Sequence, residues 1–155
     1  MFSLSANGNS QKTIQHLNTL LSEYQVYYQN LRALHWNVRG KHFFELHAKF
    51  EELYLAAQNT IDEIAERILA LNGRPLHTLT QYLEHRTIDV AENISSAEAA
   101  ADIILNNLLI LFNRSREGLA EAADQNDEGT VDLLSSIIHQ LEKDAWMFRA
   151  FRESA

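Results

Sequence analysis

The sequence offers few places at which a helix could be interrupted. It contains one proline and five glycines in 155 residues, and 46% of its residues are apolar. Leu, Ala, Glu and Gln are abundant and favour helix interiors, whereas glycine and proline disfavour them most. Strand signals are sparse. The chain is therefore predicted to be all-α, and its length suits one domain with a sizeable core.

Apolar residues recur with helical spacing in four long segments of the chain. The first two segments predict helices over about residues 11–37 and about residues 43–72. Gly40 separates them, and Gly73 and Pro75 end the second. Because the link between them is short, the two helices are predicted to be antiparallel neighbours.

The second half of the chain predicts another pair of long helices. Ser95, with Glu98 three residues later, predicts a capping box that opens the third helix. The fourth follows a polar turn at 124–129. A long connection at 75–95 precedes this pair and contains a predicted short helix at 79–85. Four long helices with a long link between the second and third favour a ferritin-like four-helix bundle.

Several other classes of protein are disfavoured by the composition. Residues 1–10 are polar and are predicted to be a flexible tail ahead of one domain at 11–155. No apolar run reaches the roughly 18 residues of a membrane span, and no signal peptide is predicted. The absence of cysteine excludes disulfides and thiolate chemistry. These features are compatible with the cytoplasm, which is the predicted location.

Four side chains of the kinds that bind iron lie in the first two predicted helices: His35, His47, Asp62 and Glu66. Asp62 and Glu66 are four residues apart and share a helix face. One continuous helix would place His47 about 22 Å from Asp62, at about 1.5 Å per residue. One ion cannot bridge that distance. Either the set is accidental, or a second chain supplies the missing ligands.

The second predicted helix carries a polar stripe within a sector of about 100°. The stripe is nearly symmetric about residues 54 and 55, because His47 mirrors Asp62 and Glu51 mirrors Gln58. Two such helices, antiparallel across a two-fold axis, would bring His47 of one chain to Asp62 of the other and form the site twice. The pattern permits this shared site without requiring it. A stripe that simply faces solvent is the alternative.

A set of imidazoles and carboxylates suits Fe(II) and leaves coordination positions open. Zinc would bind the same ligands and is a predicted competitor. Because histidine binds metals only when it is neutral, acid is expected to weaken binding.

The stretches LRALHWNVRGKHFFELHAKFEELY and TIDEIAERI resemble the hallmark of the Dps family, the miniferritins. The His35–Trp36 pair, the gap to His47, and Asp62 with Glu66 stand where the motif of that family has them. The resemblance extends over nearly the whole chain, through the region of residues 144–148.

This resemblance implies a hollow dodecamer of four-helix subunits that oxidises Fe(II), preferably with hydrogen peroxide, and stores the ferric product as mineral. It also implies that the ferroxidase site lies between two-fold-related subunits. His35 and His47 then come from one chain, and Asp62 and Glu66 come from its partner. Glu51 matches a carboxylate that helps to hold a second iron.

Three further residues carry open alternatives. Trp36 adjoins a predicted ligand and is either a one-electron donor to stray oxidants or an interface packing residue. Asp127 and Asp132 lie near the start of the fourth predicted helix. The resemblance suggests that they line a three-fold pore that draws in iron, while Asp127 is also a candidate helix cap; both can hold at once.

DNA binding is the alternative function that the resemblance raises, because some relatives bind DNA through a lysine-rich tail. Here residues 1–12 contain a single basic residue, Lys12, and the formal net charge is −8. Binding of phosphates through counterion release is therefore not expected near neutral pH. A passive iron-buffering shell without a catalytic site is a third possibility, which the intact ligand set disfavours.

Overall fold

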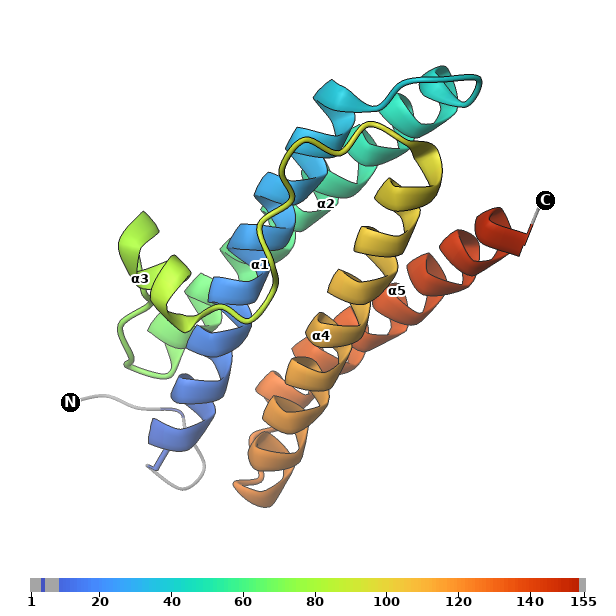
Figure 1. Cartoon of the computed structure of the whole chain (residues 1–155). Coiled ribbons are helices and arrows are strands. Elements are labelled where there is room, and N and C mark those ends of the chain that lie inside the picture. Colours follow the sequence, from blue (N-terminus) through green and yellow to red (C-terminus); the bar gives the residue numbers. More distant parts are fainter. Residues whose placement is uncertain (1–3, 5–8, 154–155) are drawn as a thin grey trace.

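The computed structural model describes residue 4 and residues 9–153, and this part of the chain contains five helices and no strand (Figure 1). The helices are α1 (Gln11–Asn37), α2 (Phe43–Ala70), α3 (Leu79–His85), α4 (Ala97–Asp124) and α5 (Glu128–Glu153). The predicted all-α class is confirmed. Of the predicted tail, residues 1–3 and 5–8 lie outside the described residues.

The four long helices form two antiparallel hairpins, α1 with α2 and α4 with α5 (Figure 1). The connection from α2 to α4 includes α3 and runs along α1 to the opposite end of the bundle. Helix α1 contacts α2, α3 and α4, and therefore holds the two hairpins together. This confirms the predicted four-helix bundle with a short helix in its crossover. No helix in the described part is long and apolar enough to cross a membrane.

The N-terminus of α4 differs by one residue from the prediction. Its N-cap is Ser96, whose hydroxyl accepts a hydrogen bond from the Ala99 amide at 3.1 Å. The predicted capping box of Ser95 with Glu98 is therefore wrong. The carbonyl of Ser95 accepts from the Arg39 amide at 2.9 Å, which holds Ser95 outside the helix.

A capping box does occur at the start of α3, where it was not predicted. The Thr78 hydroxyl accepts from the Gln81 amide at 3.1 Å, and the Gln81 side chain accepts from the Thr78 amide at 3.1 Å. None of the residues of α3 is buried. A short helix with little burial depends on local interactions of this kind, because helix nucleation is costly.

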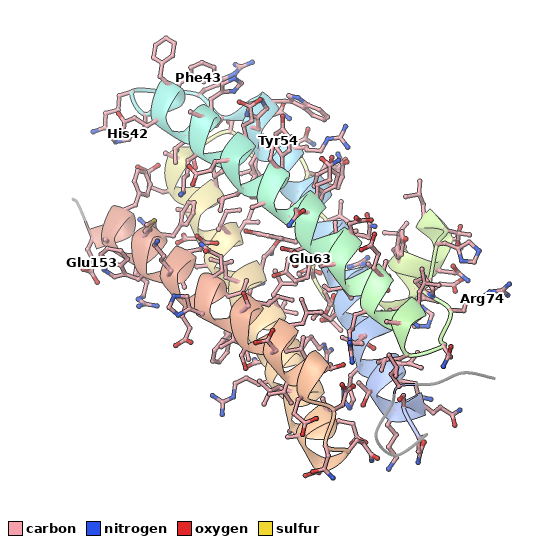
Figure 2. All side chains as sticks on the ribbon, turned by 180° about the vertical axis from the view of Figure 1, so that it is seen from behind. His42, Phe43, Tyr54, Glu63, Arg74 and Glu153 are labelled. Carbon is pink, nitrogen blue, oxygen red and sulfur yellow. The ribbon has the colours of Figure 1, made fainter. Side chains whose placement is uncertain are left out.

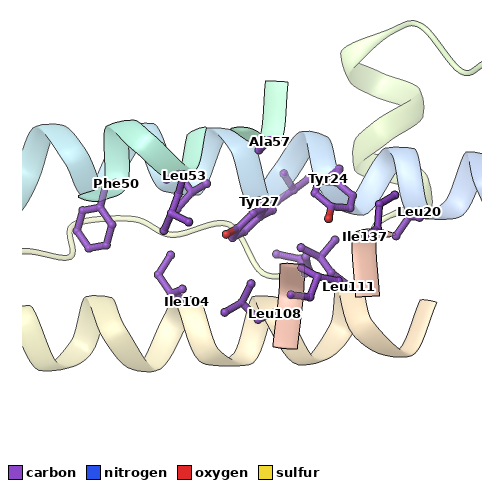
Figure 3. Packing of buried hydrophobic residues seen from close by; sticks show 14 of the residues in the cluster. Leu20, Tyr24, Tyr27, Phe50, Leu53, Ala57, Ile104, Leu108, Leu111 and Ile137 are labelled. Carbon is purple, nitrogen blue, oxygen red and sulfur yellow. The ribbon is translucent and has the colours of Figure 1, made fainter. Parts of the chain in front are cut away.

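The core lies between the facing apolar stripes of the four long helices (Figure 3). The ring of Phe50 on α2 stacks on that of Phe148 on α5, with centroids 6.4 Å apart. Each such side chain contributes about 1.5–3 kcal/mol when it is fully buried. The largest fully buried residues are Phe50, Leu17, Leu20, Leu21, Leu31, Leu34, Ile64, Ile68, Ile88, Ile104, Leu108 and Leu111.

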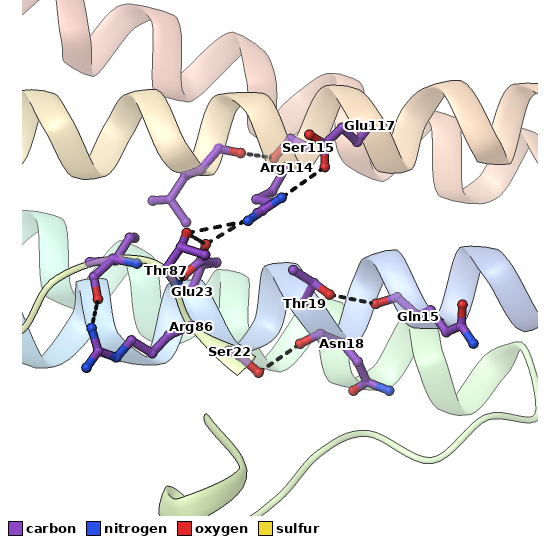
Figure 4. Close-up of polar contacts among 12 residues, drawn as sticks. Gln15, Asn18, Thr19, Ser22, Glu23, Arg86, Thr87, Arg114, Ser115 and Glu117 are labelled. Carbon is purple, nitrogen blue, oxygen red and sulfur yellow. Dashed lines mark hydrogen bonds and ion pairs between the residues drawn. The ribbon is translucent and has the colours of Figure 1, made fainter. Parts of the chain in front are cut away.

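A buried carboxylate on α1 fixes the path of the crossover. Glu23 is 0% exposed and accepts hydrogen bonds from the amides of Thr87 and Ile88 at 2.6 and 3.0 Å. It also accepts from the Thr87 hydroxyl. The guanidinium of Arg114 on α4 lies 3.4 Å from the same carboxylate (Figure 4). One side chain of α1 therefore joins both the crossover and α4.

Asn30, two turns further along α1, makes a second set of contacts with the crossover. Its side-chain oxygen accepts from the Ala91 amide at 2.9 Å, and its amide group donates to the carbonyl of Asp89 at 2.9 Å. The same amide group also donates to the side chain of Asn107 on α4, at 3.0 Å. An extended segment has no secondary-structure partners, so its polar backbone groups need acceptors and donors of this kind.

Asp144 on α5 is a second buried carboxylate. It is 7% exposed and accepts a hydrogen bond from Gln140 at 3.0 Å. Burial raises the pKa of Asp144, although its hydrogen bond with Gln140 and the charge of Lys49 oppose the shift. Burial, with a smaller contribution from the charge of Asp144, likewise raises the pKa of Tyr24 and Tyr27. An ionised Asp144 is therefore unfavourable in this core.

We predict that Glu23→Ala lowers the free energy of unfolding by about 3 kcal/mol, because it leaves the buried Ile88 amide and the partly buried Thr87 amide without an acceptor. Glu23→Gln retains an acceptor oxygen and is expected to cost less. Urea unfolding followed by circular dichroism measures both. Equal stability of Glu23→Ala and the parent would contradict the proposed role of Glu23 in the crossover.

We predict that Asp144→Asn stabilises the protein at neutral pH but not in acid. Because the pKa of Asp144 is raised on folding, its stabilising contribution is present at low pH and lost as the pH rises through that folded-state pKa. The neutral amide avoids this loss. Thermal midpoints of variant and parent should therefore converge near pH 4 and separate by a few degrees at pH 7. A difference that does not change with pH would contradict the prediction.

Candidate metal centre

The turn between α1 and α2 brings two predicted ligands into contact. His35 lies in the last turn of α1, and His47 lies near the start of α2. Their rings are stacked, with centroids 3.7 Å apart and an interplanar angle of 14°. His35 is buried and His47 is half-buried. The two histidines therefore form one rigid pair.

Reciprocal hydrogen bonds orient the two rings. Nδ1 of His35 lies 2.7 Å from the carbonyl of His47, and Nδ1 of His47 lies 2.8 Å from the carbonyl of His35. A carbonyl can only accept, so each Nδ1 carries a proton. In the neutral rings both Nε2 atoms then keep a lone pair. Hydrogen bonds of this kind are typical of metal-binding histidines, because they fix the tautomer and the ring orientation.

The end of α1 explains why the carbonyl of His35 is available. If the helix continued, the Arg39 amide would donate to this carbonyl. That amide instead donates to the carbonyl of Ser95, at the end of the crossover. Helix termini leave carbonyls unsatisfied in this way, and the ring of His47 takes the place of the missing donor.

Aromatic side chains enclose the histidine pair. Phe43 stacks against His47 with centroids 5.0 Å apart, and Tyr54 meets His35 edge-on at 5.4 Å. The Tyr54 hydroxyl donates to Glu51 at 3.3 Å, so this carboxylate is linked to the pair through the tyrosine. Desolvation and the charge of Glu51 raise the pKa of Tyr54, so the hydroxyl remains a donor at neutral pH. Phe43 and Tyr54 are not among the residues that the sequence pattern indicated for the site.

The other two predicted ligands lie elsewhere on α2. Asp62 and Glu66 are exposed, on the same stripe as the exposed Glu51 and Gln58. Figure 2 shows this side of α2, with Tyr54 and Glu63 labelled along it. Within residue 4 and residues 9–153, no three His, Asp or Glu side chains lie close enough together to hold a metal. The fold therefore brings His35 and His47 together but not the whole set.

Asp127 and Asp132, the two predicted pore residues, have different surroundings. Asp127 caps α5, because its carboxylate accepts from the amide of Thr130 at 3.1 Å and from its hydroxyl at 2.6 Å. The same carboxylate pairs with Arg67 of α2 at 2.7 Å. Asp132 is exposed and, with Asp127 and Glu128, lines a groove of about 500 Å³. The capping role of Asp127 is confirmed, and Asp132 is the more exposed of the two predicted pore carboxylates.

Arg67 stands in the TIDEIAERI stretch that resembles the Dps motif, but the sequence did not predict its role. Its guanidinium also donates to the Thr130 hydroxyl at 2.9 Å. It crosses so close to Gly129 that a Cβ there would lie 2.8 Å from two guanidinium nitrogens. A larger residue at this position would displace Arg67. The D-x-x-T spacing of Asp127 and Thr130 indicates a cap, and the motif contains Arg67, but neither signal shows that these residues meet.

Trp36 lies on the surface of α1 and is 58% exposed. The guanidinium of Arg32 lies 5.1 Å from the centroid of its indole ring. Within the chain, Trp36 is therefore not a core residue. Its two alternative roles, interface packing and electron donation, remain predictions.

Comparison with known proteins identifies the class of this fold. A model of the ferritin-like domain matches residues 14–154. A Dps protein from Vibrio cholerae, described as a member of a broad superfamily of ferritin-like diiron-carboxylate proteins, has a crystal structure that superposes with a TM-score of 0.90. It is 44% identical in sequence, and the match covers 92% of this chain and 89% of that one. The protein is thus a ferritin-like four-helix bundle.

Two further relatives narrow the assignment. DNA protection during starvation protein 2 of Bacillus anthracis is 41% identical over 142 residues, which cover 92% of this chain and 97% of the relative. A zinc-soaked crystal of Dps from Listeria innocua gives a TM-score of 0.87 at 30% identity, covering 90% of this chain and 94% of that one. The chain belongs to the Dps family, which confirms the resemblance noted in the sequence.

We predict that Asp127 and Asp132 respond differently to substitution. Asp127→Ala removes the helix cap and leaves Arg67 without its carboxylate, so it should lower the free energy of unfolding by about 2 kcal/mol or more. The exposed Asp132→Ala should change it by less than about 0.5 kcal/mol. Urea unfolding of both variants measures the difference. Equal losses would contradict the distinct roles of the two carboxylates.

Proposed function

We propose that this protein is a ferroxidase and iron-storage protein that oxidises Fe(II), preferably with hydrogen peroxide, in a dodecameric shell. The observation that carries the proposal is the hydrogen-bonded pair of His35 and His47. It presents two preset nitrogen ligands, and among the described residues no carboxylate lies close enough to complete a metal site with them. Such a pair is half of a metal site. The other half is proposed to come from a second copy of the chain.

The outer face of α2 supports a shared site. Its carboxylates Asp62 and Glu66 are exposed, and Leu55 is 55% exposed close to the pseudo-symmetric centre of the stripe. Antiparallel pairing of two α2 helices would bring the partner subunit's Asp62 and Glu66 to His35 and His47, and would form the site twice.

The residues would act mainly by holding and orienting Fe(II), which is a substrate of the reaction. The Nε2 atoms of His35 and His47 and the partner subunit's Asp62 and Glu66 supply the nitrogen and oxygen ligands that suit this ion. Glu51, held by Tyr54, would help to hold a second Fe(II). Two Fe(II) ions together supply the two electrons that reduce one peroxide to water. Paired delivery avoids the release of hydroxyl radical.

The relatives support iron as the metal and zinc as a competitor. The Vibrio cholerae protein is described as a ferritin-like diiron-carboxylate protein, and the Listeria innocua crystal was soaked with zinc. The Bacillus anthracis relative is named for DNA protection. With a net charge of −8, this protein is proposed to protect DNA by removing iron and peroxide in the cytoplasm rather than by contact.

We predict that the double variant His35→Ala/His47→Ala oxidises Fe(II) with peroxide at least about 100-fold more slowly than the parent, because it loses both nitrogen ligands. Stopped-flow absorbance of Fe(III), with peroxide added to anaerobic Fe(II)-loaded protein, measures the rate. His139→Ala, which changes an exposed histidine on α5, is the matched control. Rates equal to that of the parent would favour the passive shell.

Mixing two inactive variants tests whether the site is shared. Asp62→Asn/Glu66→Gln should also be inactive. When its chains are refolded with an equal amount of His35→Ala/His47→Ala chains, half of the dimers contain one of each. Each mixed dimer regains one intact site of its two, so about a quarter of the parent activity should return. No recovery, with normal assembly by light scattering, would contradict the shared site.

A further inference from the structure

Tyr54 of α2 links the histidine pair to the carboxylate of Glu51. Its ring meets that of His35 edge-on, with centroids 5.4 Å apart and an interplanar angle of 81°. It also meets the ring of Tyr28 edge-on, at 6.1 Å and 80°. Edge-to-face contacts of this kind favour one orientation of an aromatic ring. Two residues of α1 therefore set where the hydroxyl of this α2 side chain lies.

The hydroxyl of Tyr54 donates to Oε1 of Glu51 at 3.3 Å. The two residues are three positions apart and so share one face of α2. An exposed glutamate otherwise has many rotamers, and fixing it for a metal costs conformational entropy. The hydrogen bond restricts Glu51 before any metal arrives. It engages one carboxylate oxygen, so Oε2 is the atom left for a metal.

Glu51 differs in this respect from the other carboxylates on the polar stripe of α2. Asp62 and Glu66 make no side-chain hydrogen bond or ion pair within the described part of the chain, whereas Glu51 is held by Tyr54. Glu51 does not form a three-ligand group with the histidine pair. A carboxylate that is linked to the pair but does not complete its site suits a second ion beside the first.

We propose that Tyr54 is a positioning residue for the second Fe(II), and that it acts by holding Glu51 through its hydroxyl. This inference rests on the proposed function, in which Glu51 helps to hold that ion. Loss of a hydrogen bond to a metal ligand typically lowers metal affinity by about 10–100-fold. At 3.3 Å this bond is long for an O–H donor, so the lower end of that range applies.

Tyr54→Phe removes the hydroxyl and retains the ring that contacts His35 and Tyr28. Anaerobic calorimetric titration of the full-length, assembled protein with Fe(II) measures the two binding events at each site. We expect the affinity for the second Fe(II) to fall about tenfold, whereas that for the first should stay within about twofold. An unchanged second event would overturn the proposal. Equal losses at both events would also overturn it, because support of His35 by the ring would explain them.

A double-mutant cycle shows whether Tyr54 acts through Glu51. In a Glu51→Ala background there is no carboxylate to hold, so Tyr54→Phe should cause no further loss of affinity for the second Fe(II). The same titration measures Glu51→Ala and the double variant. A further loss of about tenfold in the double variant would overturn the proposal, because it would equal the full effect of the hydroxyl without Glu51.

Mixed dimers place Tyr54→Phe in either half of the one intact site. Added to Asp62→Asn/Glu66→Gln chains, which supply the histidines, it changes the tyrosine of that site. Added to His35→Ala/His47→Ala chains, it changes the tyrosine of the inactive site. The Fe(II) concentration that gives half-maximal oxidation by peroxide should be about tenfold higher in the first arrangement. Equal concentrations would overturn the proposal, because both mixed dimers contain the same substitutions.

The titration of the parent tests the proposed function separately. Two Fe(II) at each of two sites per dimer correspond to two Fe(II) per chain. A parent that bound no Fe(II) would refute the proposed function and this inference together. A parent that binds two Fe(II) per chain, with the same second affinity as Tyr54→Phe, would overturn this inference alone.

Discussion

The buried carboxylate of Glu23 is the interaction on which the arrangement of the bundle depends. A crossover that runs the length of a bundle has polar backbone groups and no secondary structure in which to pair them. Glu23 and Asn30 supply these partners from α1 and also contact α4. The crossover thereby becomes part of the packed structure. It fixes α4 beside α1, while the stripe of α2 that carries Asp62 and Glu66 remains on the surface.

The crossover also influences the candidate metal centre. Ser95, the last residue of the crossover before the cap of α4, accepts the hydrogen bond of the Arg39 amide. The carbonyl of His35 is therefore free to accept a hydrogen bond from the ring of His47. The tautomers of both histidines are thus set by backbone groups, which substitution cannot remove. A pair of ligands that is oriented before metal arrives needs no rearrangement to bind it.

Arginines lie against two of the residues that the sequence singles out. Arg67 pairs with the carboxylate of Asp127, so this residue, which the resemblance suggests for a pore, also holds α2 against the start of α5. Arg32 lies over Trp36, so the residue that the sequence suggests as an electron donor carries a positive charge on its face. At Asp127 the neighbour, and not the residue type alone, decides what the side chain can do.

The helical class and the approximate helix limits could be predicted from the sequence, and so could the separation that keeps His47 and Asp62 from sharing one ion within a chain. These follow from helical periodicity, which is a local property and can be counted along the sequence. The tertiary structure alone decided the tautomers of His35 and His47, the shift of the α4 cap from Ser95, and the partner of Asp127. Those depend on hydrogen bonds between segments distant in sequence, and only the packing of the helices brings such segments together.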